Sequence, residues 1–116
     1  MTYLPNVQTV VETPEYLKAS ARAGMDDEER QDVVTLISAN PAAGILLDGG
    51  IRKVRVPGKG RGKSGGYRVI TYYMDDAQPV FLLTVISKGQ RANLTEDQKR
   101  SVKQVAKAEK SKRGRQ

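Results

Sequence analysis

The stretch IRKVRV-PGKGRGKSGG-YRVITYYM, residues 51–74, decides the fold class. Valines and cations alternate in its first part, which predicts a strand over residues 50–57 with one dry face and one solvated face. Residues 67–74 predict a second strand, and the glycine-rich segment 57–66 predicts a flexible basic loop between the two. The stretch therefore indicates two neighbouring strands that carry a cluster of positive charge.

The flanking segments add further strands. Residues 80–87 are almost entirely apolar and predict a central strand, which the chain reaches through a hairpin turn at Asp75-Asp76. Because the connections between these three consecutive strands are short, an antiparallel meander is favoured. Nearer the N-terminus, residues 6–11 predict one more short strand.

Three helix-start signals are present in the sequence. Thr13-Pro14-Glu15 supplies a hydroxyl N-cap, a proline at the first helical position and an acidic residue in the first turn. Asp26 with Glu29 resembles a capping box that opens a second helix, and residues 95–98 (TEDQ) resemble another that opens a last helix.

We therefore expect an α+β fold in a single domain over residues 1–109, with an antiparallel sheet of about four strands. An N-terminal helical pair is expected to cover one face of the sheet, and a C-terminal helix follows the strands. Residues 110–116 are predicted to be a basic, frayed tail.

The missing residue types limit the chemistry of the chain. It has 116 residues and contains no His, Cys or Trp. The common general base, the thiolate nucleophile and most zinc or iron sites are therefore excluded, and we expect neither a metal nor a cofactor. The absence of cysteine fits a cytoplasmic protein, and no apolar run suggests a membrane span or a signal peptide. Any reaction must use Lys, Arg, Tyr or carboxylates, or groups of the substrate.

The net charge of +7 is unevenly distributed. Residues 1–98 carry equal numbers of basic and acidic side chains, so residues 99–116 supply the whole excess. Within the balanced part, the stretch 51–74 contains no acidic residue and these cations: Arg52, Lys53, Arg55, Lys59, Arg61, Lys63 and Arg68. Such a patch attracts polyanions, of which nucleic acid is the commonest in a cell. The alternative is an ordinary solvated strand face beside a mobile loop.

Strand parity decides whether these cations meet. Lys53 and Arg55 share one face of their strand, and Arg68 shares a face of the next strand with Tyr72. Parity alone does not say whether the two faces coincide. If they do, the cations converge beside the loop with Lys88 at the rim, and a bound phosphate chain would offset their mutual repulsion.

A phosphate-binding Walker loop is excluded. Gly62-Lys63-Ser64 matches the end of G-x-x-x-x-G-K-[ST], but the first glycine of that pattern would fall on Pro57. The segment that follows predicts a strand, so the helix N-terminus that completes such an anion site is missing. We therefore do not expect a nucleotide triphosphatase.

A specific combination is formed by residues 49–57 (GGIRKVRVP), residues 60–70 (GRGKSGGYRVI), and Ser87-Lys88 ahead of Asn93-Leu94-Thr95. This combination resembles the RelE superfamily of bacterial toxins, and within it the HigB-like branch, over residues 10–107. The resemblance implies a compact microbial-ribonuclease-like fold and a toxin that cleaves messenger RNA in the ribosomal A site. It also implies a cognate antitoxin of the helix-turn-helix DNA-binding type, through which alone the toxin would reach operator DNA.

The resemblance also implies site residues. By position, the catalytic residues of the cationic cleft are Lys53, Arg55, Arg68 and Lys88. Further RNA- or phosphate-binding candidates are Lys59, Arg61, Lys63 and Tyr72. The sequence departs from some relatives because no His and no C-terminal Tyr follows the cleft residues, and Tyr72 is the candidate replacement for that aromatic residue.

RNA carries its own nucleophile, the 2′-hydroxyl, so a ribonuclease can work without His or Cys. Our hypothesis is that Arg55 and Arg68 clamp the scissile phosphate while Lys53 assists deprotonation of the 2′-hydroxyl. Lys88 or Arg61 would stabilise the leaving 5′-oxygen. Two alternatives stay open, a ParE-like gyrase inhibitor with the same fold and a noncatalytic RNA-binding module.

Overall fold

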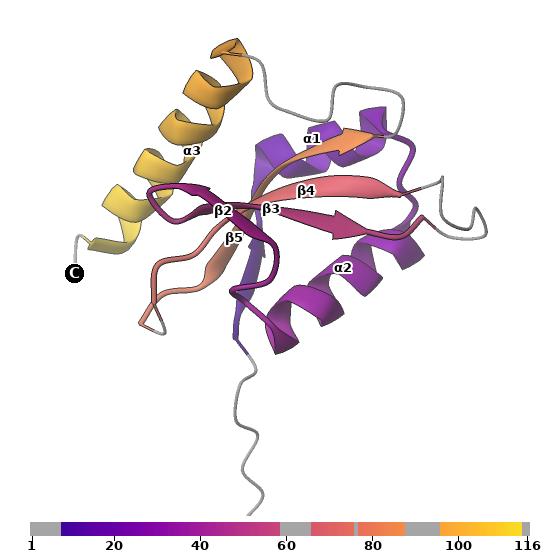
Figure 1. The fold of residues 1–116 in the computed structure, drawn as a ribbon, viewed down its shortest axis with the longest axis horizontal. Coiled ribbons are helices and arrows are strands. Elements are labelled where there is room, and N and C mark those ends of the chain that lie inside the picture. The colour runs from indigo at the N-terminus through magenta and orange to yellow at the C-terminus, as the bar shows by residue number, and fades with distance from the viewer. Residues whose placement is uncertain (1–7, 59–65, 76, 88–95, 115–116) are drawn as a thin grey trace, which may run out of the picture.

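The computed structural model describes residues 8–58, 66–75, 77–87 and 96–114. In these residues the chain forms a sheet and three helices (Figure 1). The elements, in chain order, are β1 (Val10–Glu12), α1 (Pro14–Arg22), α2 (Asp27–Ala39), β2 (Ile45–Asp48), β3 (Ile51–Val56), β4 (Tyr67–Tyr72), β5 (Val80–Ser87) and α3 (Glu96–Gly114).

The sheet has five strands in the order β1-β5-β4-β3-β2. The pairs β2–β3, β3–β4 and β4–β5 are antiparallel, which confirms the predicted meander. The expectation of about four strands, all antiparallel, is wrong in two respects. β1 runs parallel to β5, because the chain returns from the helical pair in β2 with the opposite direction to β1 and then reverses three times to reach β5. β2 is an additional edge strand.

The edge strand β2 escaped prediction because it has no alternating pattern. Its sequence is ILLD, and all four residues are exposed. It is joined to β3 by Gly49 and Gly50, whose φ angles are 54° and 88°. A two-residue turn with positive φ at both positions is the type that matches the twist of a tight hairpin. The glycine pair was therefore the signal for a preceding strand as well as for a turn.

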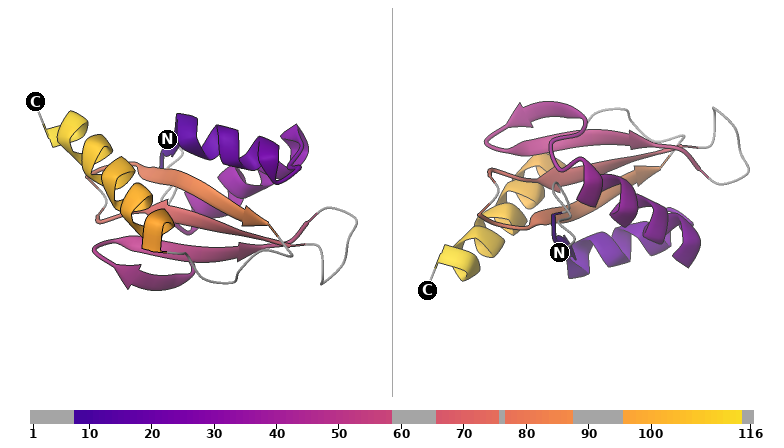
Figure 2. Two further views of the ribbon diagram at one scale, coloured as in Figure 1. Left: turned by 90° about the horizontal axis from the view of Figure 1, so that it is seen from above. Right: turned by 90° about the horizontal axis from the view of Figure 1, so that it is seen from below.

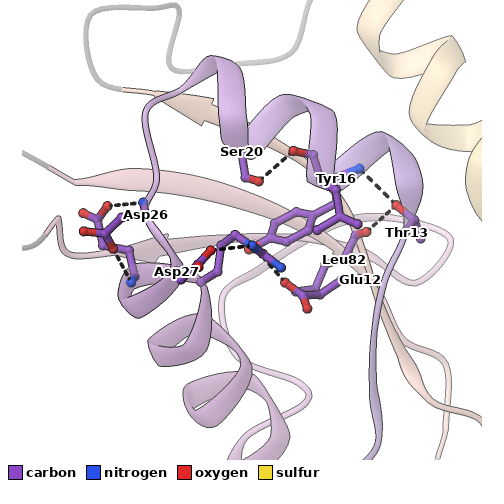
Figure 3. A network of polar contacts seen from close by, with 10 residues as sticks. Glu12, Thr13, Tyr16, Ser20, Asp26, Asp27 and Leu82 are labelled. Atoms are coloured by element: carbon purple, nitrogen blue, oxygen red, sulfur yellow. Dashed lines mark hydrogen bonds and ion pairs between the residues drawn. The ribbon is translucent and has the colours of Figure 1, made fainter.

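The two N-terminal helices begin as their capping signals predict. The Oγ1 atom of Thr13 accepts a hydrogen bond from the Tyr16 N–H at 3.2 Å and donates one to the carbonyl oxygen of Leu82 at 2.7 Å (Figure 3). The first cap therefore also fixes α1 to β5. In α2 the Asp26 carboxylate accepts from the Glu29 N–H at 2.8 Å, and the Glu29 carboxylate accepts from the Asp26 N–H at 3.0 Å. Both bonds of the capping box are present.

The sheet separates two hydrophobic cores, because its two faces are covered by different helices. Figure 2 shows the α1–α2 pair and α3 on opposite sides of the sheet. The core under the helical pair includes Tyr16, Ala19, Val33, Ile37, Val54, Val56, Val69, Val80, Leu82 and Val85. The core under α3 consists of Ile51, Ile70, Tyr72, Phe81, Leu83, Ile86, Val102 and Ala106.

The last helix extends further than we expected. α3 continues to Gly114, whereas we predicted a frayed chain from residue 110 onward. Thr95, the predicted N-cap of this helix, lies outside the described residues. None of the helices in the part of the chain that the structure describes is long and apolar enough to cross a membrane.

Candidate functional site

The register between β3 and β4 brings the predicted cations together. Arg55 pairs directly with Arg68, and Lys53 pairs with Ile70. Paired residues of antiparallel strands project from the same face, as do residues two apart on one strand. Lys53, Arg55 and Arg68 therefore share one face of the sheet, which answers the question that parity left open. We call these three residues the cationic face.

The cationic face lies on the side of the sheet that α3 covers. The residues paired along this side include Ile51 with Tyr72, and both pack against α3 in the second core. The helix covers only part of this side. Arg55 is exposed, and Lys53 and Arg68 are half-buried. These charged side chains therefore border the apolar surface of the sheet against which α3 packs.

Arg52 is the cation of β3 that does not belong to this cluster. It projects from the opposite side of the strand, where its Nη1 donates a hydrogen bond to the carbonyl oxygen of Tyr73 at 2.8 Å. Its guanidinium also lies over the Tyr73 ring, 5.7 Å from the ring centroid. Both contacts are within the protein, so the structure gives Arg52 a structural role.

Four of the predicted site residues, Lys59, Arg61, Lys63 and Lys88, lie outside the described residues. The described strands nevertheless show where the chain leaves the sheet. Val56 pairs with Tyr67, and Tyr67 pairs with Ser87, so the three strand ends lie side by side next to the Arg55–Arg68 pair. The roles of these four residues stay predictions.

Tyr72 does not lie where an RNA-binding aromatic residue is useful. Its side chain is 5% exposed, and its ring packs on Phe81 with the ring centroids 6.1 Å apart. This burial under α3 leaves little ring surface for a nucleobase. The alternating pattern placed Tyr72 on the correct side of the sheet, but it did not reveal that a helix covers that position.

A recess of about 380 Å³ lies where β2 and β3 face α3. Its lining is Leu47, Asp48, Ile51, Lys53, Lys99, Val102 and Lys103. Because Lys53 lines it, the recess is continuous with the cationic face. Sequence reasoning missed Lys99 and Lys103 as site residues, because it treated the C-terminal cations as a source of net charge. The signal was their spacing, since Lys99, Lys103 and Lys107 are four residues apart along one side of α3.

Comparison with known families identifies the family of this chain. Residues 10–116 match the model of the RelE toxin of the RelE / RelB toxin-antitoxin system. The chain belongs to the RelE toxin family. As a RelE family member it is the toxin of a toxin–antitoxin system, and a cognate antitoxin is its partner. The family and the α+β fold expected from the sequence are thus confirmed, while the assignment to the HigB-like branch stays a prediction.

In this RelE family toxin, a buried carboxylate fixes the beginning of β4. The Tyr67 hydroxyl donates to the Glu29 carboxylate, with both Oε atoms at 3.3 Å. Glu29 is the buried member of the α2 capping box. Since Tyr67 and Arg68 are adjacent on a strand and point to opposite faces, this contact holds the backbone that presents Arg68. The sequence identified Glu29 as a cap but gave no sign of this second contact.

A second polar network connects β1 with the helical pair. Arg30 bridges Glu12 at 3.2 Å and Asp27 at 3.0 Å (Figure 3). The hydrogen bond to Glu12 is the main cause that raises the pKa of Arg30 above its usual value. Tyr16 is fully buried, and burial, with a smaller contribution from Glu12, raises its pKa to about 12. These groups lie under α1 and α2, on the opposite side of the sheet from the cationic face.

Proposed function

We propose that this toxin is a ribosome-dependent endoribonuclease that cleaves messenger RNA in the ribosomal A site and thereby inhibits translation. The observation that supports the proposal is the direct pairing of Arg55 with Arg68, with Lys53 on the same face. Like charges placed opposite each other on neighbouring strands destabilise a sheet. A bound phosphate would offset that cost, and two guanidinium groups suit its oxygens.

The reaction that fits these groups uses the RNA as its own nucleophile. The 2′-oxygen forms a bond to phosphorus as the bond from phosphorus to the 5′-oxygen breaks. Arg55 and Arg68 would bind the nonbridging oxygens, whose negative charge grows in the transition state. Lys53 would assist removal of the 2′-hydroxyl proton. The products are a 2′,3′-cyclic phosphate and a 5′-hydroxyl end, and the step as proposed uses no metal.

The leaving 5′-oxygen must gain a proton or a compensating positive charge. Lys88 and Arg61 are our candidates for this role, because their positions match the family motif. The chain leaves the sheet toward both residues at the end where Arg68 is placed. The ribosome would supply the bent RNA conformation that aligns the 2′-oxygen with the bond to be broken.

Cleavage of translated messenger RNA tests the proposal. Mapping of RNA ends in a translation extract should show that Arg55→Ala and Arg68→Ala each lower the cleavage rate by about 100-fold or more. Arg22→Ala, which removes an exposed cation from the far side of the sheet, is the matched control and should keep the wild-type rate.

Three results would contradict the proposal. Wild-type rates for folded Arg55→Ala and Arg68→Ala would remove the proposed clamp. RNA binding without cleavage would favour a noncatalytic binding module, with affinity that falls steeply with salt. Inhibition of gyrase supercoiling without RNA cleavage would favour the ParE-like alternative.

We also propose that the toxin acts in the cytoplasm, where translated messenger RNA is found, and that its antitoxin carries a helix-turn-helix DNA-binding fold. The family match supports the existence of the antitoxin. Coexpression with the product of the adjacent reading frame should suppress toxicity, and the purified complex should bind operator DNA. Operator binding by the toxin alone would contradict this assignment.

A further inference from the structure

We infer that the recess between β2, β3 and α3 binds one nucleotide of the RNA, next to the phosphate that is cleaved. The inference rests on the proposed ribonuclease function. It assigns a binding role to Leu47, Lys99 and Lys103, which the sequence analysis did not include in the site.

The lining of the recess combines the two kinds of surface that a nucleotide requires. Leu47, which is 44% exposed, provides apolar contact that suits the face of a nucleobase, and the largely buried Ile51 and Val102 form the apolar floor of the recess. Lysine side chains provide positive charge for a phosphate, and three of them, Lys53, Lys99 and Lys103, line the same recess. Asp48 is the carboxylate in this lining, so the charge balance within it is positive.

The dimensions indicate a small ligand. The recess measures about 380 Å³. Pockets for small molecules generally measure about 300–1,000 Å³. The recess is therefore at the lower end of this range and fits a single nucleotide better than a longer segment.

Its position relates it to the proposed cleavage site. Lys53 lines the recess and also belongs to the cationic face, two residues along β3 from Arg55, which is the next position on the same side of the sheet. An RNA chain held by Arg55 and Arg68 would therefore reach the recess with a neighbouring nucleotide.

The lysines on α3 can turn toward a ligand at little cost. The Nζ atom of Lys103 lies 3.0 Å from Oδ2 of Asp48, and both side chains are more than half exposed. The Nζ atom of Lys99 lies 3.5 Å from Oε2 of Glu96, and these two side chains are also more than half exposed. Ion pairs of this kind contribute little to stability, so a phosphate can replace either carboxylate.

The competing occupant is a segment of the antitoxin. Ile45 and Leu46 of β2 are also exposed, and an apolar edge strand attracts protein partners. Neither of these two residues lines the recess, whereas three lysines do. The charge and the continuity with the cationic face thus favour RNA, and antitoxin binding becomes one outcome of the test.

The test measures binding of the full chain to a short 2′-O-methyl RNA, which lacks the nucleophilic hydroxyl and stays intact. Leu47→Ala should weaken binding about fivefold through lost contact with the base. The matched control is Leu46→Ala, which truncates a more exposed apolar side chain of the same strand that pairs with Arg52 and so lies on the opposite side of the sheet from the cationic face. It should leave the affinity unchanged.

The lysines are tested in the same assay. Lys99→Ala and Lys103→Ala should each weaken binding about three- to tenfold and should make the affinity less dependent on salt. Lys18→Ala, on the exposed surface of α1 across the sheet, is the matched control. A local disturbance of β2 or α3 would not by itself change the salt dependence.

An abasic scan distinguishes a base-binding recess from a general loss of affinity. The bases of the RNA are removed one at a time, and the affinity of the wild type and of Leu47→Ala is measured for each RNA. Leu47→Ala should no longer weaken binding when the base that occupies the recess is missing, and should still weaken it when any other base is missing. An effect that is equal at every position, or absent, would overturn the inference. So would a Leu47→Ala variant that binds RNA normally but binds the antitoxin more weakly.

Failure of this inference and failure of the proposed function give different results. If Arg68→Ala abolishes cleavage while Leu47→Ala, Lys99→Ala and Lys103→Ala behave as wild type, the recess assignment is wrong and the ribonuclease proposal stands. If the wild-type toxin neither binds nor cleaves RNA, the ribonuclease proposal is wrong and the recess assignment falls with it.

Discussion

Tyr16 shows at the scale of one residue how burial affects the response of this protein to pH. Its hydroxyl has no hydrogen-bond partner in the described part of the chain, and its pKa is raised to about 12. In the unfolded chain the pKa of a tyrosine is about 10. Ionisation therefore favours unfolding, and the stability that Tyr16 contributes below pH 10 is lost as the pH rises toward 12.

Tyr16→Phe should remove this pH dependence. Near pH 11 the wild-type protein should lose about 1.4 kcal/mol more of its free energy of unfolding than the variant, relative to neutral pH. At neutral pH the variant should be as stable as the wild type or slightly more stable, because a buried hydroxyl without a partner is removed. Urea unfolding at both pH values measures this, and parallel losses in the two proteins would contradict it.

Arg55 and Arg68 form a pair that we propose for phosphate binding and that lowers the stability of the folded protein. Because these like charges are directly paired, Arg55→Thr should raise the free energy of unfolding by about 0.2–1 kcal/mol at low salt. The gain should shrink as salt screens the repulsion. Urea unfolding at two salt concentrations tests this, with Arg22→Gln as the control. A variant that is less stable than the wild type at low salt would show that the pair is not repulsive.

Residue-level prediction succeeded where alternation alone decides the outcome. It gave the shared face of Lys53 and Arg55 correctly. It could not decide whether Arg68 joins them, because that depends on strand register. Nor could it place Tyr72, since alternation gives a side of the sheet but does not show whether a helix covers it.

At the scale of elements, the predictable features were those with a local cause. Each of the caps of α1 and α2 joins two residues that are three apart in sequence, and both caps were predicted correctly. The edge strand β2 was missed because its pairing partner, and not its own pattern, makes it a strand. The recess was missed for a similar reason, since β2 and α3 meet only in the folded chain.

Glu29 gives an element-scale prediction, because it joins α2 to β4. Glu29→Ala removes one bond of the capping box and leaves the Tyr67 hydroxyl without the carboxylate. We expect a loss of about 1–3 kcal/mol in the free energy of unfolding, measured by urea denaturation. Asp32→Ala, an exposed acidic residue of the same helix, should change it by less than about 0.5 kcal/mol. Equal effects of the two variants would contradict the link to β4.

At the scale of the whole molecule, the two hydrophobic cores hold their helices to the sheet with different strength. Two helices close one core, whereas α3 closes the other with a thin apolar face of Val102, Val105 and Ala106. Sequence reasoning predicted the helical pair and the meander. It did not predict that β1 is parallel to β5, because the path of the helical pair across the sheet sets that direction.

This asymmetry predicts that α3 separates from the sheet more readily than the strands separate from one another. In hydrogen exchange of the full chain, amides of α3 should exchange faster than those of β4, which is paired on both sides. Exchange of α3 at the rate of β4 would contradict the prediction and would mean that the helix opens only when the whole protein unfolds. Because Lys99 and Lys103 line the proposed nucleotide site, 2′-O-methyl RNA should slow the exchange of α3. In Leu47→Ala this slowing should be smaller, since the variant changes the opposite wall of the recess and leaves the helix itself unaltered.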